Sequence, residues 1–280
     1  MAGRVWCIPE SYYEDLAMMI SHSSVNKYDF CPRAYRYYYI EGWRPKVKKP
    51  PLLFGEAVDV ALTALFKAGE EPLSVFEAAW LKHKDSPVEW GKRNTWEGFL
   101  EIGKKLLDRF VSEEAPRFTE VSPENVQCRL SAQVNDLVVV GYPDLVSQVD
   151  GLLSLVDFKT SLSSYDPEEV QLNEQLTAYW WLCLANGLPV ERVAFCVLLK
   201  LKEPRIEWYF SARSEQDVAE YQEKLQLIAS DIECKRFPKK TSSCGHMGGC
   251  EFKPLCLGDE AQIRDKLTLR DEIPEDEVIV

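Results

Sequence analysis

The sequence predicts a mixed α/β fold in which a central sheet is covered by helices. Apolar residues recur at helical spacing in several segments after residue 54, which indicates amphipathic helices. Shorter runs rich in β-branched and aromatic residues lie between them and are typical of strands. The expected order is helices, three strands, a helix, two strands and a helix. With 280 residues, 46% of them hydrophobic, the chain can bury a sizeable core.

The first half of the chain is expected to be mainly helical. Hydroxyl side chains at 21–24 can cap a helix that runs to about residue 40 and that Pro32 interrupts. A basic, proline-containing loop covers 43–53. Further helices are expected over 54–67, with Phe54, Val58, Leu62 and Leu65 inward, and over 70–83 and 93–114.

The second half alternates expected strands and helices. Residues 124–134 resemble a strand that leads into a hairpin over 138–161, whose turn, Asp150-Gly151, tolerates positive φ. A helix is expected over 167–185, with Leu172, Leu176, Tyr179, Trp180 and Cys183 buried. Strands over 193–201 and 205–210 and a helix over 214–236 complete the expected core.

Three charged side chains interrupt the apolar hairpin: Asp144, Asp157 and Lys159. Residues i and i+2 of a strand share a face, so Asp157 and Lys159 point one way and Phe158 points towards the core. A hairpin that brings Asp144 to Asp157 gathers two carboxylates and an ammonium, which is costly unless a divalent cation is held there. Oxygen ligands of this kind suit Mg²⁺. A surface ion network is the alternative.

These residues also resemble a known signature. Pro143-Asp144, twelve residues and then Asp157-Phe158-Lys159 resemble the motif of the PD-(D/E)XK nuclease superfamily. The motif follows a segment beginning FGEAVD and precedes Gln175 and Tyr179, and SSVNKYDFCPRAYRYYY stands near the start. Together these resemble the RecB-like branch over residues 20–257. The resemblance implies a restriction-endonuclease-like core, a mixed central sheet flanked by helices.

The resemblance also implies roles for the hairpin residues. Asp144 and Asp157 would hold one or two Mg²⁺ or Mn²⁺ ions, and the backbone carbonyl of Phe158 would add a ligand. Lys159 would orient the attacking water or stabilise charge that develops on the phosphate. This agrees with the chemistry, because phosphodiester hydrolysis needs an activated water, charge neutralisation and in-line placement.

Helical residues complete the implied site. Gln175 and Tyr179 are one turn apart and would position the scissile strand, with helix packing as their alternative role. Relatives carry the pattern G-x-x-x-His in the first helix, whereas Gly55 is followed here by Asp59. Asp59 is therefore a candidate third metal ligand, and an exposed helix residue is its alternative role.

The nine cysteines fall into two groups. Five are scattered and are expected to be buried as small apolar residues: Cys7, Cys128, Cys183, Cys196 and Cys234. Cys244, Cys250 and Cys256 are evenly spaced, with five residues between each pair, and Cys31 is the candidate for a fourth thiolate.

The second group resembles the cysteines of iron–sulphur nucleases in the superfamily: CRISPR-adaptation nucleases, the AddB nuclease domain and exonuclease V. They imply a 4Fe-4S cluster that joins the N- and C-terminal segments, although the C-x-x-C of several relatives is absent. Zinc held by four cysteines, or with His246 replacing one, and free thiols are the alternatives.

The net charge of −12 argues superficially against a nucleic-acid partner, but two segments of the chain are basic. Residues 27–49 carry a net charge of +5 and 235–253 carry +4, while the segment from Asp259 carries −5. A solvated surface is the alternative role of each charged run. The candidate DNA-binding residues are Arg33, Arg36, Tyr35, Lys46, Lys48, Lys239 and Lys240.

We therefore expect a nuclease domain over 21–257, between an N-terminal extension (1–20) and an acidic tail (258–280). The expected activity is that of a Mg²⁺- or Mn²⁺-dependent DNA exonuclease acting on single-stranded ends in recombination, repair or phage DNA processing. Prespacer trimming in CRISPR adaptation and a non-catalytic DNA-binding or assembly subunit are the alternatives. A helicase, recombinase or integrase is the expected kind of partner. Without a long apolar run or signal-peptide region, the protein is expected in the cytoplasm, or inside an infected host cell, without membrane attachment.

Overall fold

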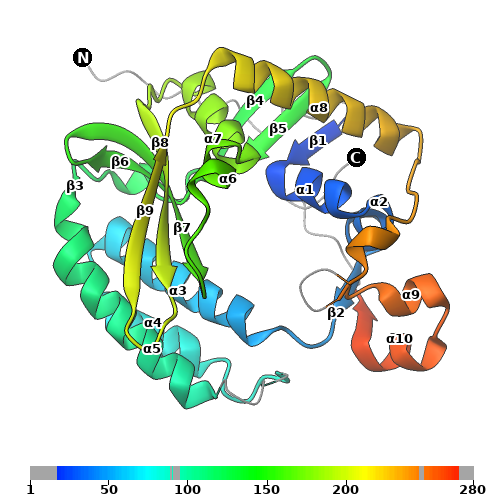
Figure 1. The fold of residues 1–280 in the computed structure, drawn as a ribbon, viewed down its shortest axis with the longest axis horizontal. Coiled ribbons are helices and arrows are strands. Elements are labelled where there is room, and N and C mark those ends of the chain that lie inside the picture. The colour runs from blue at the N-terminus through cyan, green and yellow to red at the C-terminus, as the bar shows by residue number, and fades with distance from the viewer. Residues whose placement is uncertain (1–17, 89, 91–94, 246–248, 271–280) are drawn as a thin grey trace. The chain divides into compact units, whose positions relative to one another are not determined.

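A computed structural model describes residues 18–88, 90, 95–245 and 249–270 (Figure 1). The chain divides into two compact units. The first unit takes in the described residues of 1–47, 131–141 and 216–280, and the second those of 48–130 and 142–215. Most of the expected N-terminal extension and the tail beyond Arg270 lie outside the described residues.

The second unit contains a five-stranded sheet. In sheet order its strands are β3 (Phe118–Thr119), β6 (Leu145–Val149), β7 (Leu152–Ser161), β8 (Arg192–Leu199) and β9 (Arg205–Ser211). The pair β7–β8 is parallel and the other neighbours are antiparallel, so the sheet is mixed. This confirms the expected mixed α/β fold with a central sheet.

Helices flank this sheet (Figure 1). Those of the second unit are α3 (Pro50–Ala68), α4 (Pro72–Leu81), α5 (Trp96–Arg109), α6 (Pro167–Gln171) and α7 (Glu174–Ala185). The apolar face of α3, with Phe54 and Leu62, shares one buried core with Val156 of β7 and Leu198 of β8. Two prolines begin α3, where missing amide hydrogens are tolerated, and Gly69 ends it in the left-handed region at φ 66°.

The hairpin expected over 138–161 is shorter than the sequence predicts. Leu137–Gly141 forms β5, which pairs with strands of the first unit, so the expected continuous strand over 137–149 is wrong. Tyr142 and Pro143 separate β5 from β6, and proline has no amide hydrogen with which to continue a ladder. The hairpin itself is β6–β7, and its turn confirms the expectation for Asp150 and Gly151, which have φ values of 52° and 81°.

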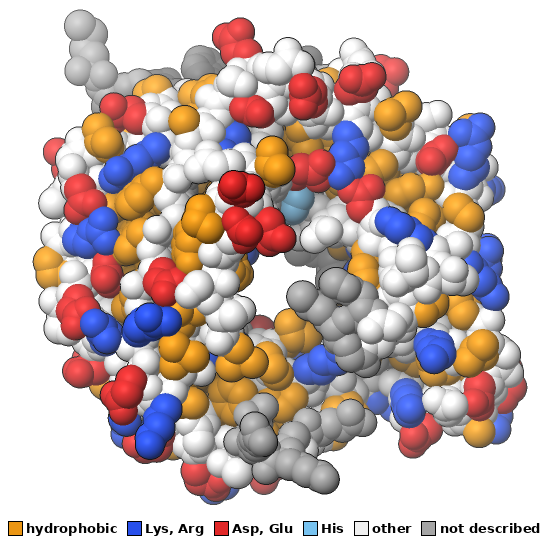
Figure 2. Space-filling model, viewed as in Figure 1, with side chains coloured by type: hydrophobic (Ala, Val, Ile, Leu, Met, Phe, Trp, Pro, Cys, Tyr) orange, Lys and Arg blue, Asp and Glu red, His pale blue; other side chains and the backbone are white. Residues whose placement is uncertain are grey.

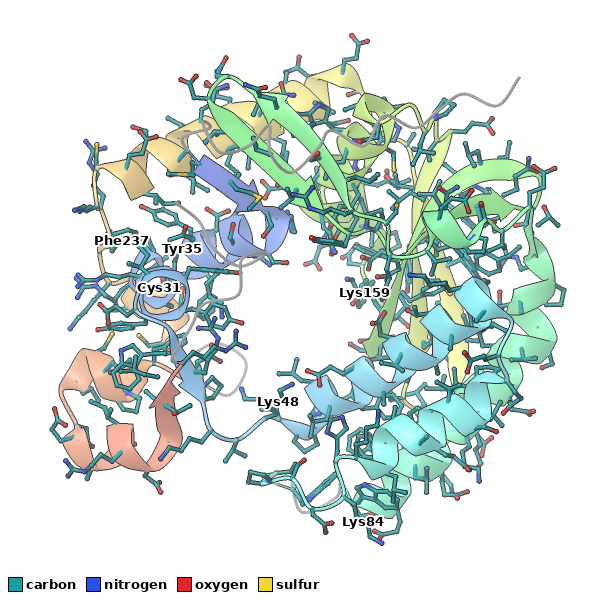
Figure 3. All side chains as sticks on the ribbon, turned by 180° about the vertical axis from the view of Figure 1, so that it is seen from behind. Cys31, Tyr35, Lys48, Lys84, Lys159 and Phe237 are labelled. Atoms are coloured by element: carbon teal, nitrogen blue, oxygen red, sulfur yellow. The ribbon has the colours of Figure 1, made fainter. Side chains whose placement is uncertain are left out.

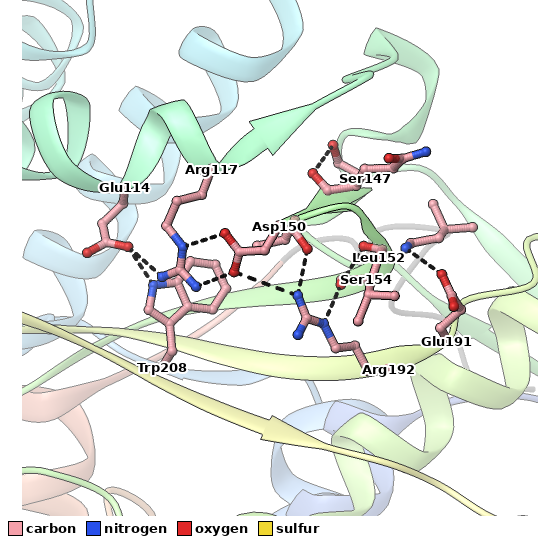
Figure 4. A network of polar contacts seen from close by, with 12 residues as sticks. Glu114, Arg117, Ser147, Asp150, Leu152, Ser154, Glu191, Arg192 and Trp208 are labelled. Atoms are coloured by element: carbon pink, nitrogen blue, oxygen red, sulfur yellow. Dashed lines mark hydrogen bonds and ion pairs between the residues drawn. The ribbon is translucent and has the colours of Figure 1, made fainter.

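Polar contacts fix this turn (Figure 4). Asp150 Oδ1 and Oδ2 accept hydrogen bonds from Arg117 Nε and Nη2 at 3.0 and 2.6 Å. Arg192 donates to the carbonyl of Val149 and to the hydroxyl of Ser154. The turn is therefore tied both to the chain before β3 and to β8.

A second correction concerns the expected helix over 167–185, which is two helices. Helix α6 ends at Gln171, and the side chain of Asn173 accepts a hydrogen bond from Leu176 N to cap α7. The break leaves Leu172, expected inward, 82% exposed. Asn173 competes for backbone amides that a continuous helix would use.

The first unit is built on two small sheets. One has the order β1 (Met18–Ser21), β5 and β4 (Leu130–Val134), and the other pairs β10 (Leu267–Leu269) with β2 (Trp43–Pro45). The expected strand over 124–134 is thus formed only in its last five residues. The helices are α1 (His22–Phe30), α2 (Pro32–Tyr35), a π-helical turn (Arg36–Ile40), α8 (Glu215–Glu233), α9 (Lys253–Leu257) and α10 (Glu260–Lys266).

The start of α1 agrees with the sequence, because the Ser21 and Ser24 side chains and backbone amides form a reciprocal capping box. The helix ends before Pro32, as expected. Of the scattered cysteines, Cys183 and Cys196 are buried as expected and Cys128 is partly buried. Cys234 is exposed, which corrects that expectation, and Cys7 lies outside the described residues.

Candidate functional site

Asp144 stands where the chain enters β6, next to β7. The register pairs Leu145 with Val156, which places Asp144 beside Asp157. The Asp144 Oδ2 atom accepts a hydrogen bond from the backbone amide of Phe158 at 2.7 Å. The structure therefore brings together the two carboxylates that the sequence separates by twelve residues.

Asp157 and Lys159 form the centre of the candidate site. Asp157 is 2% exposed, and its Oδ2 atom lies 2.5 Å from Lys159 Nζ. Lys159 is the partner of Oδ2, which accepts no further hydrogen bond within the described residues. The other oxygen, Oδ1, accepts a hydrogen bond from Gln175 Nε2 at 2.9 Å. The Asp157 carboxylate is thus held between an ammonium group and an amide group.

Crowded carboxylates shape the electrostatics of this site. Burial raises the pKa of Asp144 well above its usual range, and the charge of Asp157 raises it further. Burial also raises the pKa of Asp157, against the effect of Lys159. Burial alone would lower the pKa of Lys159, but the carboxylates of Asp157 and Asp144 raise it overall. A bound cation would relieve this repulsion.

Asp59 approaches the pair from α3. Both of its carboxylate oxygens accept hydrogen bonds from Gln127 Nε2 at 2.9 Å. Burial raises the pKa of Asp59, the charge of Asp157 adds to this, and Lys159 opposes it. The Asp59 side chain is therefore partly buried, and the charges of Asp157 and Lys159 act on it. It is not the exposed helix residue that was the alternative.

Sequence reasoning missed Gln127. Its backbone amide donates to the carbonyl oxygen of Asp144 at 3.0 Å, while its side chain holds Asp59. It thereby connects two acidic residues of the site. Its φ of 48° is uncommon for a non-glycine residue, but no local pattern in the sequence signals that conformation.

Gln175 and Tyr179 both lie on α7, and Gln175 contacts Asp157 directly. Burial raises the pKa of Tyr179, with smaller effects from the charges of Asp157, Asp144 and Lys159. The structure therefore places both α7 residues around the acidic pair, although α7 begins later than expected.

The four candidate cluster cysteines all lie in the first unit. Cys31 separates α1 from α2, and together with Cys250 and Cys256 it belongs to an apolar cluster around the buried Phe252. The amide of Cys250 donates to the carbonyl of Cys244 at 3.2 Å. Burial raises the pKa of Cys250, and the neighbouring Cys31 and Cys244 contribute. None of the four is in a disulfide; His246 lies outside the described residues.

The candidate DNA-binding residues are largely engaged in contacts within the protein. Tyr35 is fully buried and stacks on Phe237, so its ring is not presented to a base (Figure 3). Arg36 pairs with Glu41 at 2.8 Å and Lys48 with Glu56 at 2.7 Å. Arg33, Lys46, Lys239 and Lys240 donate to the backbone oxygens of Phe237, Arg264, Cys256 and Asp29. On the face drawn in Figure 2, basic and acidic side chains are interspersed.

Among the described residues, no three His, Cys, Asp or Glu side chains stand close enough together to hold one metal ion as they lie. The donor set still fits a hard cation at Asp144 and Asp157, because the two carboxylates lie close enough to repel each other and carboxylate oxygens suit Mg²⁺. In the described part of the chain, no helix is long and apolar enough to cross a membrane.

The comparisons with known proteins identify the family of the chain. The family model of the PD-(D/E)XK nuclease superfamily matches residues 19–257, and the chain belongs to that superfamily. Its members are nucleases that use divalent metal ions.

Among solved structures, the chain is similar to the "Putative exonuclease" from Eubacterium rectale, with 11% identity and a TM-score of 0.58 over 96% of this chain and 97% of that chain. At this identity the likeness shows the fold. The structure of SSO0001 matches with 14% identity and a TM-score of 0.36 over 84% of this chain and 95% of that chain. No curated protein matches the chain.

Proposed function

We propose that the protein is a Mg²⁺- or Mn²⁺-dependent deoxyribonuclease that removes nucleotides from DNA ends, preferably single-stranded ones. One observation carries this proposal: Asp144, Asp157 and Lys159 meet where the chain enters β6 beside β7, the middle strand of the mixed sheet, in a member of a nuclease superfamily. The fold shared with the candidate exonuclease from Eubacterium rectale supports action at ends.

The metal would be held by Asp144, Asp157 and the carbonyl of Phe158, with Asp59 as a further carboxylate. When bound, the metal would neutralise charge on the phosphate and make a water molecule a better nucleophile. Gln127 and Gln175 hold Asp59 and Asp157 in place through their amide groups. They act as orienting partners of the ligands.

The remaining site residues would act on the DNA. Lys159 places a positive charge next to Asp157, where it can orient water or stabilise the developing negative charge on the phosphate. Tyr179 stands on the same helix as Gln175 and would help to position the scissile strand. These are positioning and electrostatic tasks, which dominate the catalysis of phosphodiester cleavage.

We also propose that Cys31, Cys244, Cys250 and Cys256 hold a 4Fe-4S cluster. Three of them share the apolar surroundings of Phe252, and the fourth is tied to Cys250 through the backbone. A cluster would connect two segments that are more than two hundred residues apart in the sequence, and it would thereby stabilise the first unit. Zinc is the competing occupant, and iron and zinc analysis separates the two.

Recombination, repair and phage DNA processing are the proposed settings, with a helicase, recombinase or integrase as partner. Exposed basic side chains such as Arg36 and Lys48 are the proposed contacts to the DNA backbone. Their ion pairs with glutamates are exposed and therefore weak, so phosphates can compete for them.

Incubation of the protein with linear and circular single-stranded DNA of the same sequence, with Mg²⁺ or Mn²⁺, tests the proposal. An exonuclease degrades the linear form and leaves the circle intact. Cleavage of both forms at equal rates would exclude action at ends. If neither form is cleaved but both are bound, the protein is a non-catalytic DNA-binding subunit.

A further inference from the structure

Tyr165 lies in the loop that joins β7 to α6, four residues after the end of the catalytic strand. Side chains of β9 anchor this loop. The Tyr165 amide donates to Tyr209 Oη at 3.0 Å, and Tyr209 Oη donates to Glu207 Oε2 at 2.6 Å. Ser164 Oγ donates to the other oxygen of Glu207 at 3.0 Å. The loop backbone at Tyr165 is therefore fixed by a connected set of hydrogen bonds.

The anchored loop places the Tyr165 ring beside the candidate active site. The strand register aligns Asp157 with Phe195 and Phe195 with Tyr209, so these three side chains form one row across a single face of the sheet. The Tyr165 ring packs edge-on against Phe195, at 5.8 Å between centroids, and lies 5.9 Å from the Tyr209 ring. Lys159 Nζ lies 5.4 Å from the same Phe195 ring.

The hydroxyl group of Tyr165 stands in the field of the catalytic pair. Burial raises the pKa of Tyr165, and Lys159 and Asp157 act on it in opposite directions. Within the described residues its backbone amide and its ring have partners, but no hydrogen bond from its hydroxyl group is found.

We propose that Tyr165 is a substrate-positioning residue whose hydroxyl group donates a hydrogen bond to a phosphate oxygen of the DNA strand next to the scissile linkage. The inference rests on the proposed nuclease function and names a contact of the same site. Phosphate oxygens commonly accept hydrogen bonds from tyrosine. Such bonds to a charged acceptor are stronger than neutral ones. The rigid ring reduces the conformational entropy lost on binding.

The test combines Tyr165→Phe with a substrate in which one linkage at a time is a neutral methylphosphonate. We expect the variant to lower kcat/KM on unmodified single-stranded DNA by about tenfold. In the wild type, a methylphosphonate at the contacted linkage should cause a similar loss, because its charge is missing. In Tyr165→Phe, a methylphosphonate at the contacted linkage should cause no further loss of kcat/KM. Methylphosphonates at other linkages that lower kcat/KM in the wild type should lower it equally in the variant.

Three controls make the result specific. Tyr38→Phe removes the hydroxyl of a half-buried tyrosine in the first unit and should leave the linkage profile unchanged. Thermal unfolding of Tyr165→Phe should match the wild type, since the variant keeps the ring and its contact with Phe195. Binding of DNA in the presence of EDTA, measured by fluorescence anisotropy, should weaken in Tyr165→Phe without any contribution from catalysis.

The outcomes separate the inference from the function on which it rests. If the wild type cleaves DNA and Tyr165→Phe matches it in kcat/KM and in linkage profile, the inference is wrong and the proposed function stands. If Tyr165→Phe loses activity but every sensitive linkage keeps its effect, Tyr165 does not contact a phosphate and the inference is also wrong. A wild type that cleaves no DNA with either metal overturns both.

Discussion

The Asp144 carboxylate accepts a hydrogen bond from the Phe158 amide at 2.7 Å. This bond joins the residue that enters β6 to the strand that carries Asp157 and Lys159. The hydrogen bond holds Asp144 next to Asp157 although the two carboxylates repel each other, and this repulsion is costly to stability.

Replacement of Asp144 by asparagine tests this cost. An asparagine oxygen can still accept from Phe158, but the neutral side chain removes the repulsion with Asp157. In EDTA we expect Asp144→Asn to raise the free energy of unfolding by about 1 kcal/mol. In the presence of Mg²⁺ we expect the same substitution to lower the rate of DNA cleavage by at least about a hundredfold. Chemical denaturation and a cleavage assay measure the two effects. An Asn variant less stable than the wild type would contradict the account.

Lys200 provides a pH-dependent prediction outside the candidate site. It is 7% exposed, and burial lowers its pKa to about 8. Its Nζ atom donates to Thr160 Oγ1 at 3.3 Å and lies 5.4 Å from the Phe54 ring. Between about pH 8 and the ordinary value of 10.5, the folded state loses this proton while the unfolded chain keeps it, so the contribution of Lys200 to stability rises with pH.

Lys200→Met should therefore be more stable than the wild type at pH 7, by up to roughly 3 kcal/mol. The difference should shrink as the pH rises towards 10.5. Urea denaturation at several pH values measures it, and Lys67→Met, at an exposed position of α3, is the matched control. A difference that is constant with pH would show that the charge of Lys200 is not its cause.

Arg117 connects the β6–β7 hairpin to the chain before β3 (Figure 4). It pairs with Asp150, Nη1 lies 2.9 Å from Glu114 Oε2, and its guanidinium lies 4.5 Å from the Trp208 ring. Because these charges are partly exposed, we expect Arg117→Met to cost only about 1 kcal/mol of unfolding free energy. Arg264→Met, which removes a fully exposed pair with Glu260, should cost less. Equal losses in both variants would contradict a special role for the Arg117 contacts.

The proposed cluster predicts distinct effects for different cysteines. Purified without oxygen, the wild type should contain four iron atoms per chain and show the broad visible absorbance of an iron–sulphur cluster. Cys31→Ser and Cys250→Ser should lose iron and lower the melting temperature. Cys234→Ser, at an exposed thiol, should change neither. A colourless wild-type protein with stoichiometric zinc would contradict the proposed cluster and would indicate a zinc site.

The sequence predicts the charged residues of the candidate site better than the residues in connecting segments that hold them in place. Asp144, Asp157 and Lys159 were expected to meet because charged residues inside apolar strands are costly without a function, and the structure brings them together. The family resemblance implied Gln175 as a site residue, and it contacts Asp157. Asp157, Lys159 and Gln175 lie in regular elements, whose periodicity fixes the direction of a side chain, and Asp144 directly precedes β6.

Residues in connecting segments could not be predicted in this way. Gln127 and Tyr165 reach the site from segments without periodicity, and tertiary contacts alone determine their positions. Strand β5 belongs to the first unit because it pairs with β1, more than a hundred residues earlier in the sequence. Local strand propensity cannot predict such a long-range pairing. Leu172 was misplaced because the amide cap at Asn173 outweighs a continuous apolar stripe.

The most direct test of the central claim is single-turnover cleavage of end-labelled single-stranded DNA by the wild type and Asp157→Asn, with Mg²⁺ or Mn²⁺ and with DNA binding measured in parallel. The substitution keeps the shape of a buried side chain and removes the charge that a metal and Lys159 both require. We predict a loss of at least about a thousandfold in the cleavage rate, with DNA affinity changed only a few-fold. Equal cleavage rates for the two proteins would contradict a catalytic centre at Asp157.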